Sequence, residues 1–216
     1  MKLSKLFAAL AMLIGIVGLV IDGWMIFPSL MTVSAQNPVA RSLPDALVNF
    51  WTYFTHLTNL GLVLVYLSEL TGWRWLGWFR QPVTQALMAG FITLVMVFYH
   101  FMLAPYYQME GALAVATFML HYVTPIAYLT WWAAFARHGT LRFRDIPLMW
   151  VPGLVYVGWV LVRGLWAHEY PYDILNPDKF GYGGVAIGVG VIFVAVTVFC
   201  CALIFFDRLL GKPRGT

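Results

Sequence analysis

The sequence has few charged residues, and this scarcity excludes an ordinary soluble domain. Only 10% of the 216 residues are Asp, Glu, Lys or Arg, whereas 62% are hydrophobic, and the mean hydropathy is +0.79. Soluble domains usually contain about 25% charged and about 45–50% apolar residues. A chain of this length cannot hide so much apolar surface in a soluble fold. The composition therefore predicts a membrane protein, and we do not interpret the net charge of +4 as a sign of nucleic-acid binding.

Cysteine is nearly absent, and so are the common catalytic motifs. Only Cys200 and Cys201 occur, side by side in an apolar run. Adjacent cysteines rarely meet disulfide geometry, so we interpret them as packing residues, with acylation as the alternative. The chain has no zinc-site spacing, Walker loop, HExxH or GxSxG motif. We therefore expect no metal and no other cofactor.

Long apolar runs are what the sequence has in abundance. A hydrocarbon core about 30 Å thick is crossed by roughly 20 apolar residues in a helix. Six runs reach this length, and proline and glycine residues punctuate the gaps between them. We predict one all-α, six-span membrane domain over residues 1–216. The spans are Phe7–Phe27, Val48–Glu69, Thr84–Ala104, Ala112–Ala136, Leu148–His168 and Val185–Phe206.

Positive charge lies mainly on one side of these spans. With the N-terminus inside, ten Lys and Arg residues fall in inner segments and only Arg41 and Lys179 in outer loops, while Arg163 lies within a span. Lys and Arg are enriched on the cytoplasmic side of membrane proteins. We therefore predict a multi-pass protein of the cell membrane with both termini in the cytoplasm. The inner residues are Lys2, Lys5, Arg74, Arg80, Arg137, Arg142, Arg144, Arg208, Lys212 and Arg214.

Several polar side chains occur inside the predicted spans, where they are costly and usually meet a partner or serve a function. Counting along each span at 1.5 Å per residue puts most of them roughly 6–14 Å below the outer boundary. We expect this shared depth to form a site between the helices. The residues are Asp22, Thr55, His56, Thr58, Asn59, His100, His121 and Arg163.

Two spans carry their polar residues along one helix face, at i, i+3, i+4, i+7 spacing. We expect these faces to point inward, toward each other. Pro125 follows His121 by four residues, which predicts a kink beside that histidine. The faces consist of Thr52, Thr55, His56 and Asn59 in the second span, and Thr117, His121, Thr124 and Tyr128 in the fourth.

A threonine hydroxyl beside a histidine can act as a nucleophile with its base. Such a pair in the outer half of a bundle suits cleavage of an ester in a lipid that arrives from the membrane. We expect Arg163 or Lys179 to hold a carboxylate or head group, and Asn59 or a hydroxyl to stabilise an oxyanion. Asp22 has two expected roles: it orients a histidine, or it pairs with Arg163.

Several stretches, in order from the second span to the last, form a recognisable pattern. They are Tyr53–Leu60, Val97–Pro105, His121–Pro125, Arg163–Gly164, Tyr170–Asp173 and Gly181–Gly183. Together they resemble the androgen-induced-protein family of multipass membrane proteins, particularly its bacterial branch. Animal members of that family are intramembrane threonine hydrolases, which cleave fatty acid esters of hydroxy fatty acids without a metal. The resemblance implies a similar topology and a lipid ester as substrate.

The resemblance also implies residue roles. It places the catalytic histidine at His121, although the animal pattern has one more residue before its proline. An alignment from Phe54 favours Thr55 as the nucleophile, whereas an alignment from Asn59 points to His56 or Thr58. We therefore predict Thr55 and His121 as the catalytic pair, with Thr58 as the alternative nucleophile. The residues expected to bind substrate or support the pair are Asp22, His56, Asn59, His100 and Arg163.

Two other functions stay open from the sequence. His56, His100 and His121 on three helices offer axial ligands for haem, although haem proteins of that kind usually have histidine pairs near both membrane faces. A non-catalytic ligand-binding or transport protein is the stronger alternative. Transporters often have paired halves with interrupted helices, and no such symmetry is visible in this chain.

Overall fold

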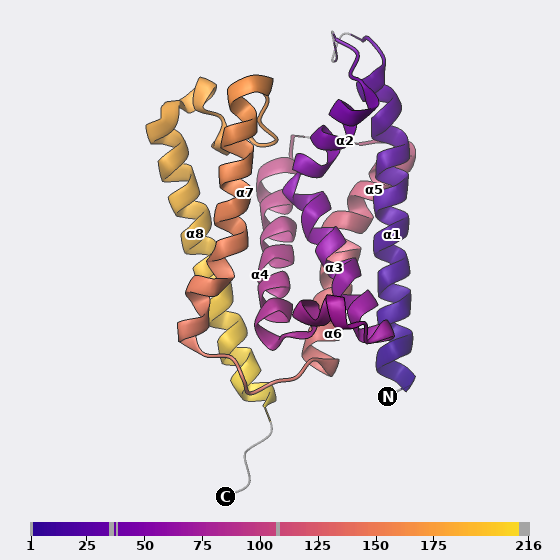
Figure 1. Ribbon diagram of the computed structural model, residues 1–216, viewed down its shortest axis with the longest axis vertical. Helices are drawn as coiled ribbons and strands as arrows, with labels where there is room; N and C mark the ends of the chain where they lie inside the picture. Colours follow the sequence, from indigo (N-terminus) through magenta and orange to yellow (C-terminus); the bar gives the residue numbers. More distant parts are fainter. Residues whose placement is uncertain (1, 35–36, 38, 107–108, 212–216) are drawn as a thin grey trace, which may run out of the picture.

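The computed structural model describes residues 2–34, 37, 39–106 and 109–211. These residues are almost entirely helical, and none of them lies in a β-strand. The helices pack side by side in one elongated bundle (Figure 1). The all-α class predicted from the sequence is therefore confirmed.

The bundle consists of eight α-helices joined by shorter helical turns within the described residues. In chain order these helices are α1 (Lys2–Met31), α2 (Leu43–Thr52), α3 (Phe54–Thr71), α4 (Pro82–Phe98), α5 (Gly111–Phe118), α6 (Thr124–Phe135), α7 (Ile146–Ala167) and α8 (Pro177–Leu210). Two π-helical turns are η2 (Tyr99–Leu103), which extends α4, and η3 (Met119–Val123), which joins α5 to α6. The 3₁₀ turns are η1 (Arg74–Arg80), η4 (Phe143–Asp145) and η5 (Asp173–Leu175).

Five helical segments of the described chain are long and apolar enough to cross a membrane. They coincide with five of the predicted spans: each begins before the predicted span, and three of them end one residue before it does. Their length and composition identify a multi-pass membrane protein. The segments are Lys2–Met31, Pro82–Leu103, Gly111–Phe135, Phe143–Ala167 and Pro177–Leu210.

The predicted second span, Val48–Glu69, differs from the structure because it is not one helix. Tyr53 has extended backbone, with φ −76° and ψ 128°, and divides the segment into α2 and α3. α3 has 18 residues, but its polar side chains make it less apolar than the five segments above. It lies inside the bundle, packed against α1 and α4 (Figure 1). A polar face is thus accommodated because this helix is surrounded by protein.

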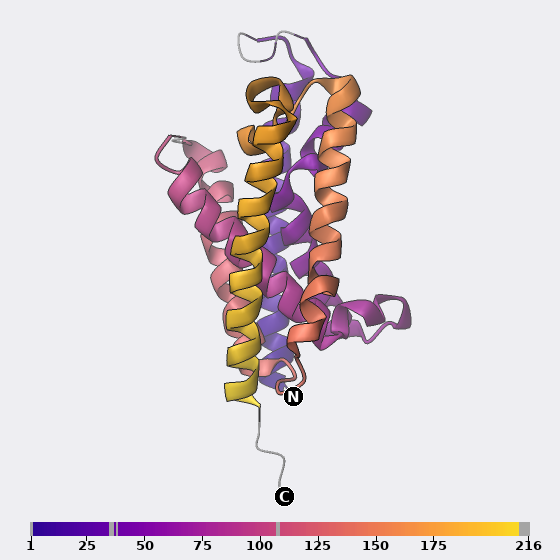
Figure 2. The same cartoon turned by 90° about the vertical axis from the view of Figure 1, so that its left-hand side faces the viewer.

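The two ends of the bundle differ in charge. α1 begins and α8 ends at the same end, together with the α3–α4 and α6–α7 connections (Figure 1). We name it the basic end, because the described Lys and Arg residues predicted to be inner lie in its segments; Lys212 and Arg214 lie outside the described residues. At this end η1 extends sideways from the bundle (Figure 2) and exposes Trp75 and Trp78. The α1–α2 and α7–α8 connections lie at the other end, the loop end.

Small residues let helices approach closely where the polar faces meet. A Cβ added to Gly18 of α1 would lie 2.9 Å from the side chain of Leu120 in η3. A Cβ added to Gly61 of α3 would lie 2.4 Å from the end of Met88 in α4. These glycines therefore bring η3 against α1 and α4 against α3.

Candidate active site

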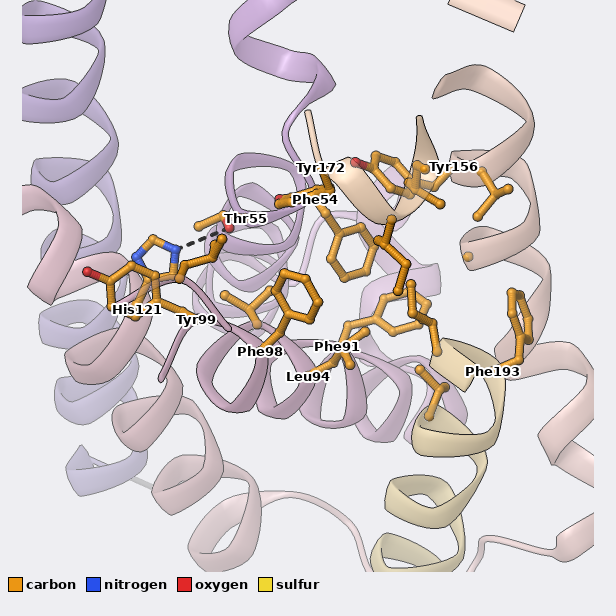
Figure 3. Close-up of a pocket in the computed structure, with 18 of the residues that line it drawn as sticks. Phe54, Thr55, Phe91, Leu94, Phe98, Tyr99, His121, Tyr156, Tyr172 and Phe193 are labelled. Carbon is orange, nitrogen blue, oxygen red and sulfur yellow. Dashed lines mark hydrogen bonds between the residues drawn. The ribbon is translucent and has the colours of Figure 1, made fainter. Parts of the chain in front are cut away.

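Thr55 and His121 meet where the polar face of α3 contacts η3. Thr55 lies in the first turn of α3, just after the break at Tyr53. Its Oγ1 is 3.3 Å from Nε2 of His121 (Figure 3). Nδ1 of His121 is 2.9 Å from the carbonyl oxygen of Thr117. Because a carbonyl only accepts, Nδ1 carries the proton and Nε2 is left to accept from the Thr55 hydroxyl.

The π-helical turn η3 sets the position of His121. Pro125 has no N–H and cannot bond to the carbonyl of His121, four residues earlier. The helix widens ahead of this proline, and the N–H of Thr124 bonds to the carbonyl of Met119, five residues earlier. Such π-bulges are frequent at functional sites. The structure thus has a π-helical turn at the position where the sequence predicted a kink.

Asn59 ties the two polar faces together. Its Nδ2 donates to the carbonyls of Thr55, at 2.9 Å, and Leu120, at 3.2 Å. Its Oδ1 accepts from the Thr124 hydroxyl at 2.5 Å. Asn59 and Thr124 are both buried. This network holds the first turn of α3 against η3 and keeps Thr55 and His121 within hydrogen-bonding distance of each other.

Asp22 and His56 form a buried pair next to this network. Nε2 of His56 is 2.8 Å from Oδ2 of Asp22, and Nδ1 is 2.6 Å from the carbonyl oxygen of Phe50. The imidazole also stacks on the Phe50 ring, with centroids 3.9 Å apart. Both nitrogens face acceptors, so both donate when the ring is an imidazolium. The expectation that Asp22 orients a histidine is confirmed, and its alternative pairing with Arg163 is wrong.

Arg163 belongs to a different cluster, at the loop end. Its Nη2 is 2.8 Å from a carboxylate oxygen of Glu169, and Arg41 bonds to both oxygens of the same carboxylate, at 2.6 and 2.9 Å. Asn49 also donates to it, at 3.3 Å. Partial burial alone would raise the pKa of Glu169, but the hydrogen bonds and charges of Arg41 and Arg163 hold it below its ordinary value. Sequence reasoning missed Glu169, whose only signal was its position six residues after Arg163.

His100 and Thr58 do not join the Thr55–His121 pair. His100 is exposed, and its Nδ1 lies 3.1 Å from the hydroxyl of Tyr122. The Thr58 hydroxyl is buried and has no hydrogen-bond partner among the described residues. Lys179 pairs with Asp173 at the loop end, at 2.5 Å. The residues of the predicted polar layer therefore fall into four separate groups, around Thr55, Asp22, Arg163 and His100, and Thr58 belongs to none of them.

The histidines do not gather as ligands for one group. His56 faces Asp22, His121 faces Thr55, and His100 lies at the surface. Within the part of the chain that the structure describes, no group of three or more His, Cys, Asp or Glu side chains is placed to hold a metal ion.

An apolar cavity opens beside the Thr55–His121 pair. It extends from that pair between α3, α4, α7 and α8 (Figure 3). It contains about 750 Å³ of space free of protein atoms, part of it open to the surroundings. Aromatic rings form much of its wall, among them Phe54, Phe91, Phe98, Trp150, Tyr156 and Phe193. Sequence reasoning missed this wall, because aromatic residues in a span look the same whether they face lipid or a cavity.

Comparisons with family models, with curated proteins and with solved structures found no match to this chain.

Proposed function

We propose that this protein is an intramembrane hydrolase of lipid carboxylic esters, with Thr55 as the nucleophile and His121 as the base. The observation that carries the proposal is the position of this pair at the edge of a long apolar cavity. The imidazole is held with its unprotonated nitrogen toward the hydroxyl. The resemblance to the androgen-induced-protein family supports the same reaction, on fatty-acyl esters such as fatty acid esters of hydroxy fatty acids.

The reaction proceeds in two half-reactions. Oγ1 of Thr55 attacks the ester carbonyl carbon while its proton passes to Nε2 of His121. The imidazolium then gives that proton to the leaving alkoxide, which departs as an alcohol and leaves an acyl-threonine ester. In the second half, water attacks this ester as His121 takes its proton, and His121 returns the proton to the threonine oxygen. A free fatty acid is released and the enzyme is restored.

The apolar cavity suits the acyl chain of such a substrate. An alkyl chain gains about 0.8 kcal/mol for each methylene that leaves water, but a chain already in lipid gains little. The cavity therefore acts mainly by placing the ester carbonyl beside Thr55. The Arg41–Glu169–Arg163 cluster lies in a separate polar recess at the loop end, and both guanidinium groups already bind Glu169. We therefore assign Arg163 a structural role instead of substrate binding.

For the membrane topology, we propose six crossings, with α2 and α3 together forming the second. Both termini are cytoplasmic, the protein lies in the cell membrane, and the site lies in the outer half of the bilayer. Two features support this arrangement. α1 begins and α8 ends at the same end of the bundle (Figure 1), and ten predicted inner Lys and Arg residues contrast with two in the outer loops.

Labelling with a fluorophosphonate, which reacts with activated hydroxyl groups, tests the hydrolase proposal. We expect the purified protein to be labelled at Thr55, and the label to be mapped there by mass spectrometry of peptides. Thr55→Ala and His121→Ala should lose both labelling and ester hydrolysis. Thr93→Ala is the matched control, because among the described residues the Thr93 hydroxyl bonds only to its own helix, at the carbonyl of Ala89. Hydrolysis at wild-type rates by both Thr55→Ala and Thr58→Ala would show that neither threonine is the nucleophile.

The alternative is a protein that binds or transports a lipid without cleaving it. The same cavity favours this alternative, because its wall is almost entirely apolar and binding needs no nucleophile. The two functions differ in one measurement. A binding protein holds the intact ester, whereas a hydrolase in the same detergent solution releases a free fatty acid.

A further inference from the structure

A hydrolase of this kind needs a donor for the oxygen that becomes negative when Thr55 attacks the ester. The Asn59 amide, expected from the sequence as one such donor, is occupied. Both of its N–H groups face backbone carbonyls, those of Thr55 and Leu120. The Thr124 hydroxyl already donates within the same network, to Oδ1 of Asn59 and the carbonyl of Leu120. The donor must therefore come from another part of the cavity wall.

Two of the three tyrosines that line the cavity are also committed elsewhere. The hydroxyl of Tyr156 donates to the carbonyl of Thr52 at 3.1 Å. The ring of Tyr99 stacks on the face of His121, with centroids 3.9 Å apart. Figure 3 shows the Tyr99 hydroxyl on the side of the imidazole away from Thr55. Neither hydroxyl is placed to reach an ester carbonyl at Thr55.

Tyr172 is the third of these tyrosines, and it lies beside the nucleophile. It lines the same cavity as Thr55 and His121, next to Phe54 and Thr55 (Figure 3). Its hydroxyl interacts with the Thr55 side chain and with the backbone at the first turn of α3. Its ring packs edge-to-face on Tyr53 and Phe98, with centroids 6.1 and 5.8 Å away. These contacts fix the phenol at the end of the cavity where the ester carbonyl must lie.

The α7–α8 connection is anchored on both sides of Tyr172. Before it, Glu169 is bonded to Arg41 and Arg163, and the Tyr170 ring fits where Gly164 has no side chain. A Cβ at Gly164 would lie 2.2 Å from that ring. After it, Leu175 is buried, with 2% of its surface exposed. The connection is thus held at both ends, as a preorganised donor requires.

We infer that Tyr172 is a third catalytic residue, whose hydroxyl donates a hydrogen bond to the ester carbonyl oxygen as that oxygen gains negative charge. The inference rests on the proposed hydrolase function. It assigns the α7–α8 connection a part in the reaction in addition to covering the cavity.

The protonation state of Tyr172 suits this role. Burial raises the pKa of the phenol to about 12, although its interactions with Thr55 and the α3 backbone offset part of the rise. The hydroxyl therefore keeps its proton at neutral pH and is available as a donor. The negative oxygen of the intermediate is stabilised most by a donor that is already in place in a site of low polarity.

Tyr172→Phe tests the inference, because it removes only the hydroxyl and keeps the ring packing. For hydrolysis of a fatty acid ester of a hydroxy fatty acid, we expect kcat to fall by about 10²–10³-fold, as for other single oxyanion donors, with little change in KM. The thermal unfolding midpoint should not change. Tyr66→Phe is the control, because the Tyr66 hydroxyl is buried without a partner among the described residues and lies outside the site. Tyr66→Phe should keep the wild-type kcat.

A second variant separates donation from packing. Replacing Tyr172 by 3,5-difluorotyrosine keeps the shape but lowers the pKa of the phenol. We expect activity to be lost at high pH, and this loss to begin at a lower pH than in the wild type. Wild-type kcat in Tyr172→Phe, or an unchanged pH profile in the fluorinated protein, overturns the role of Tyr172 while the hydrolase proposal stands. A wild-type protein that neither hydrolyses the ester nor takes the label at Thr55 overturns both.

Discussion

At the scale of single residues, the role of His121 as a base depends on Thr117, which takes no part in the reaction. The Thr117 carbonyl, one helical turn earlier, holds the proton on Nδ1 and so leaves Nε2 as an acceptor. Thr55 is then the residue whose hydroxyl can donate to it. Thr58 is on the same helix, but its hydroxyl has no base within hydrogen-bonding distance among the described residues. The geometry thus favours Thr55 of the two nucleophiles left open by the sequence.

Conservative changes at the two threonines test this choice. We expect Thr55→Ser to keep measurable hydrolysis, because the hydroxyl remains, and Thr55→Ala to fall to the background rate. Thr58→Ala should keep most of the activity, since it removes a hydroxyl that has no hydrogen-bond partner within the described part of the chain. The rates of fatty acid release from one ester substrate, measured at equal amounts of folded protein, show which threonine is the nucleophile. Loss of activity in Thr58→Ala together with retention in Thr55→Ala would exchange the two roles.

The Asp22–His56 pair is expected to matter for folding more than for chemistry. Both side chains are buried, with 5% and 6% of their surface exposed, and removing one partner leaves the other without compensation. Breaking a buried pair in this way typically costs about 3–5 kcal/mol. We expect Asp22→Ala to lower the thermal unfolding midpoint in detergent strongly, and Asp22→Asn to lower it less. A midpoint that stays at the wild-type value in Asp22→Ala would show that the pair contributes nothing to stability.

At the scale of elements, the π-helical turn η3 is the feature on which the site most depends. Pro125→Ala restores an N–H that can bond to the carbonyl of His121 and close the turn to ordinary α-helix. An α-helical turn holds one residue fewer than a π-helical turn, so this change would rotate the side chains before Pro125 by about 100° around the helix axis. His121 would then point away from Thr55. We expect hydrolysis and fluorophosphonate labelling to fall sharply while the protein still inserts. Pro28→Ala, in α1, is the control and should keep both; equal activity in the two variants would contradict the role of η3.

Element boundaries show how far the sequence was informative. Apolar run length predicted five of the spans, because helix length in a bilayer is set by its thickness. The break at Tyr53 was missed, because tyrosine is no helix breaker and its extended backbone depends on tertiary packing. The polar faces were predicted in part, because buried polar residues must meet partners. The predicted face of the second span included Thr52, which lies on α2 before the break and bonds to the carbonyl of Val48. Pairing with Arg163, one of the two roles left open for Asp22, was wrong, because the position of Glu169 depends on how the following loop folds back.

The Arg41–Glu169–Arg163 cluster makes the stability of the fold depend on pH. The pKa of Glu169 is lower in the folded protein than its ordinary value of 4.5, because the two arginines outweigh the effect of burial. A carboxylate of this kind stabilises the fold above its unfolded pKa, and the stabilisation is lost as pH falls through the folded pKa. We expect the unfolding midpoint to decrease between about pH 6 and about pH 3 by more in the wild type than in Glu169→Gln. An identical pH dependence in both proteins would show that the cluster contributes no such effect.

At the scale of the whole molecule, the site lies between two parts of the bundle. α1, α3, α5 and α6 pack together and hold the Thr55–His121 pair, whereas α7 and α8 join them mainly through α4. The cavity lies along this junction, and the α7–α8 connection adds Tyr172 to it. The proposed reaction therefore requires both parts to be docked. The orientation of the bundle in the membrane then decides from which leaflet a substrate reaches the cavity.

Single cysteines at opposite ends of the bundle test that orientation. The background protein carries Cys200→Ala and Cys201→Ala, which remove both native thiols. Lys179→Cys places a thiol at the loop end and Arg144→Cys places one at the basic end, and both positions are exposed. Because positive residues favour the cytoplasm, we expect a membrane-impermeant maleimide to label Lys179→Cys in intact cells. Arg144→Cys should be labelled only after permeabilisation. The reverse pattern would invert the topology and place the Thr55–His121 pair in the cytoplasmic half of the membrane, where its substrate would come from the inner leaflet.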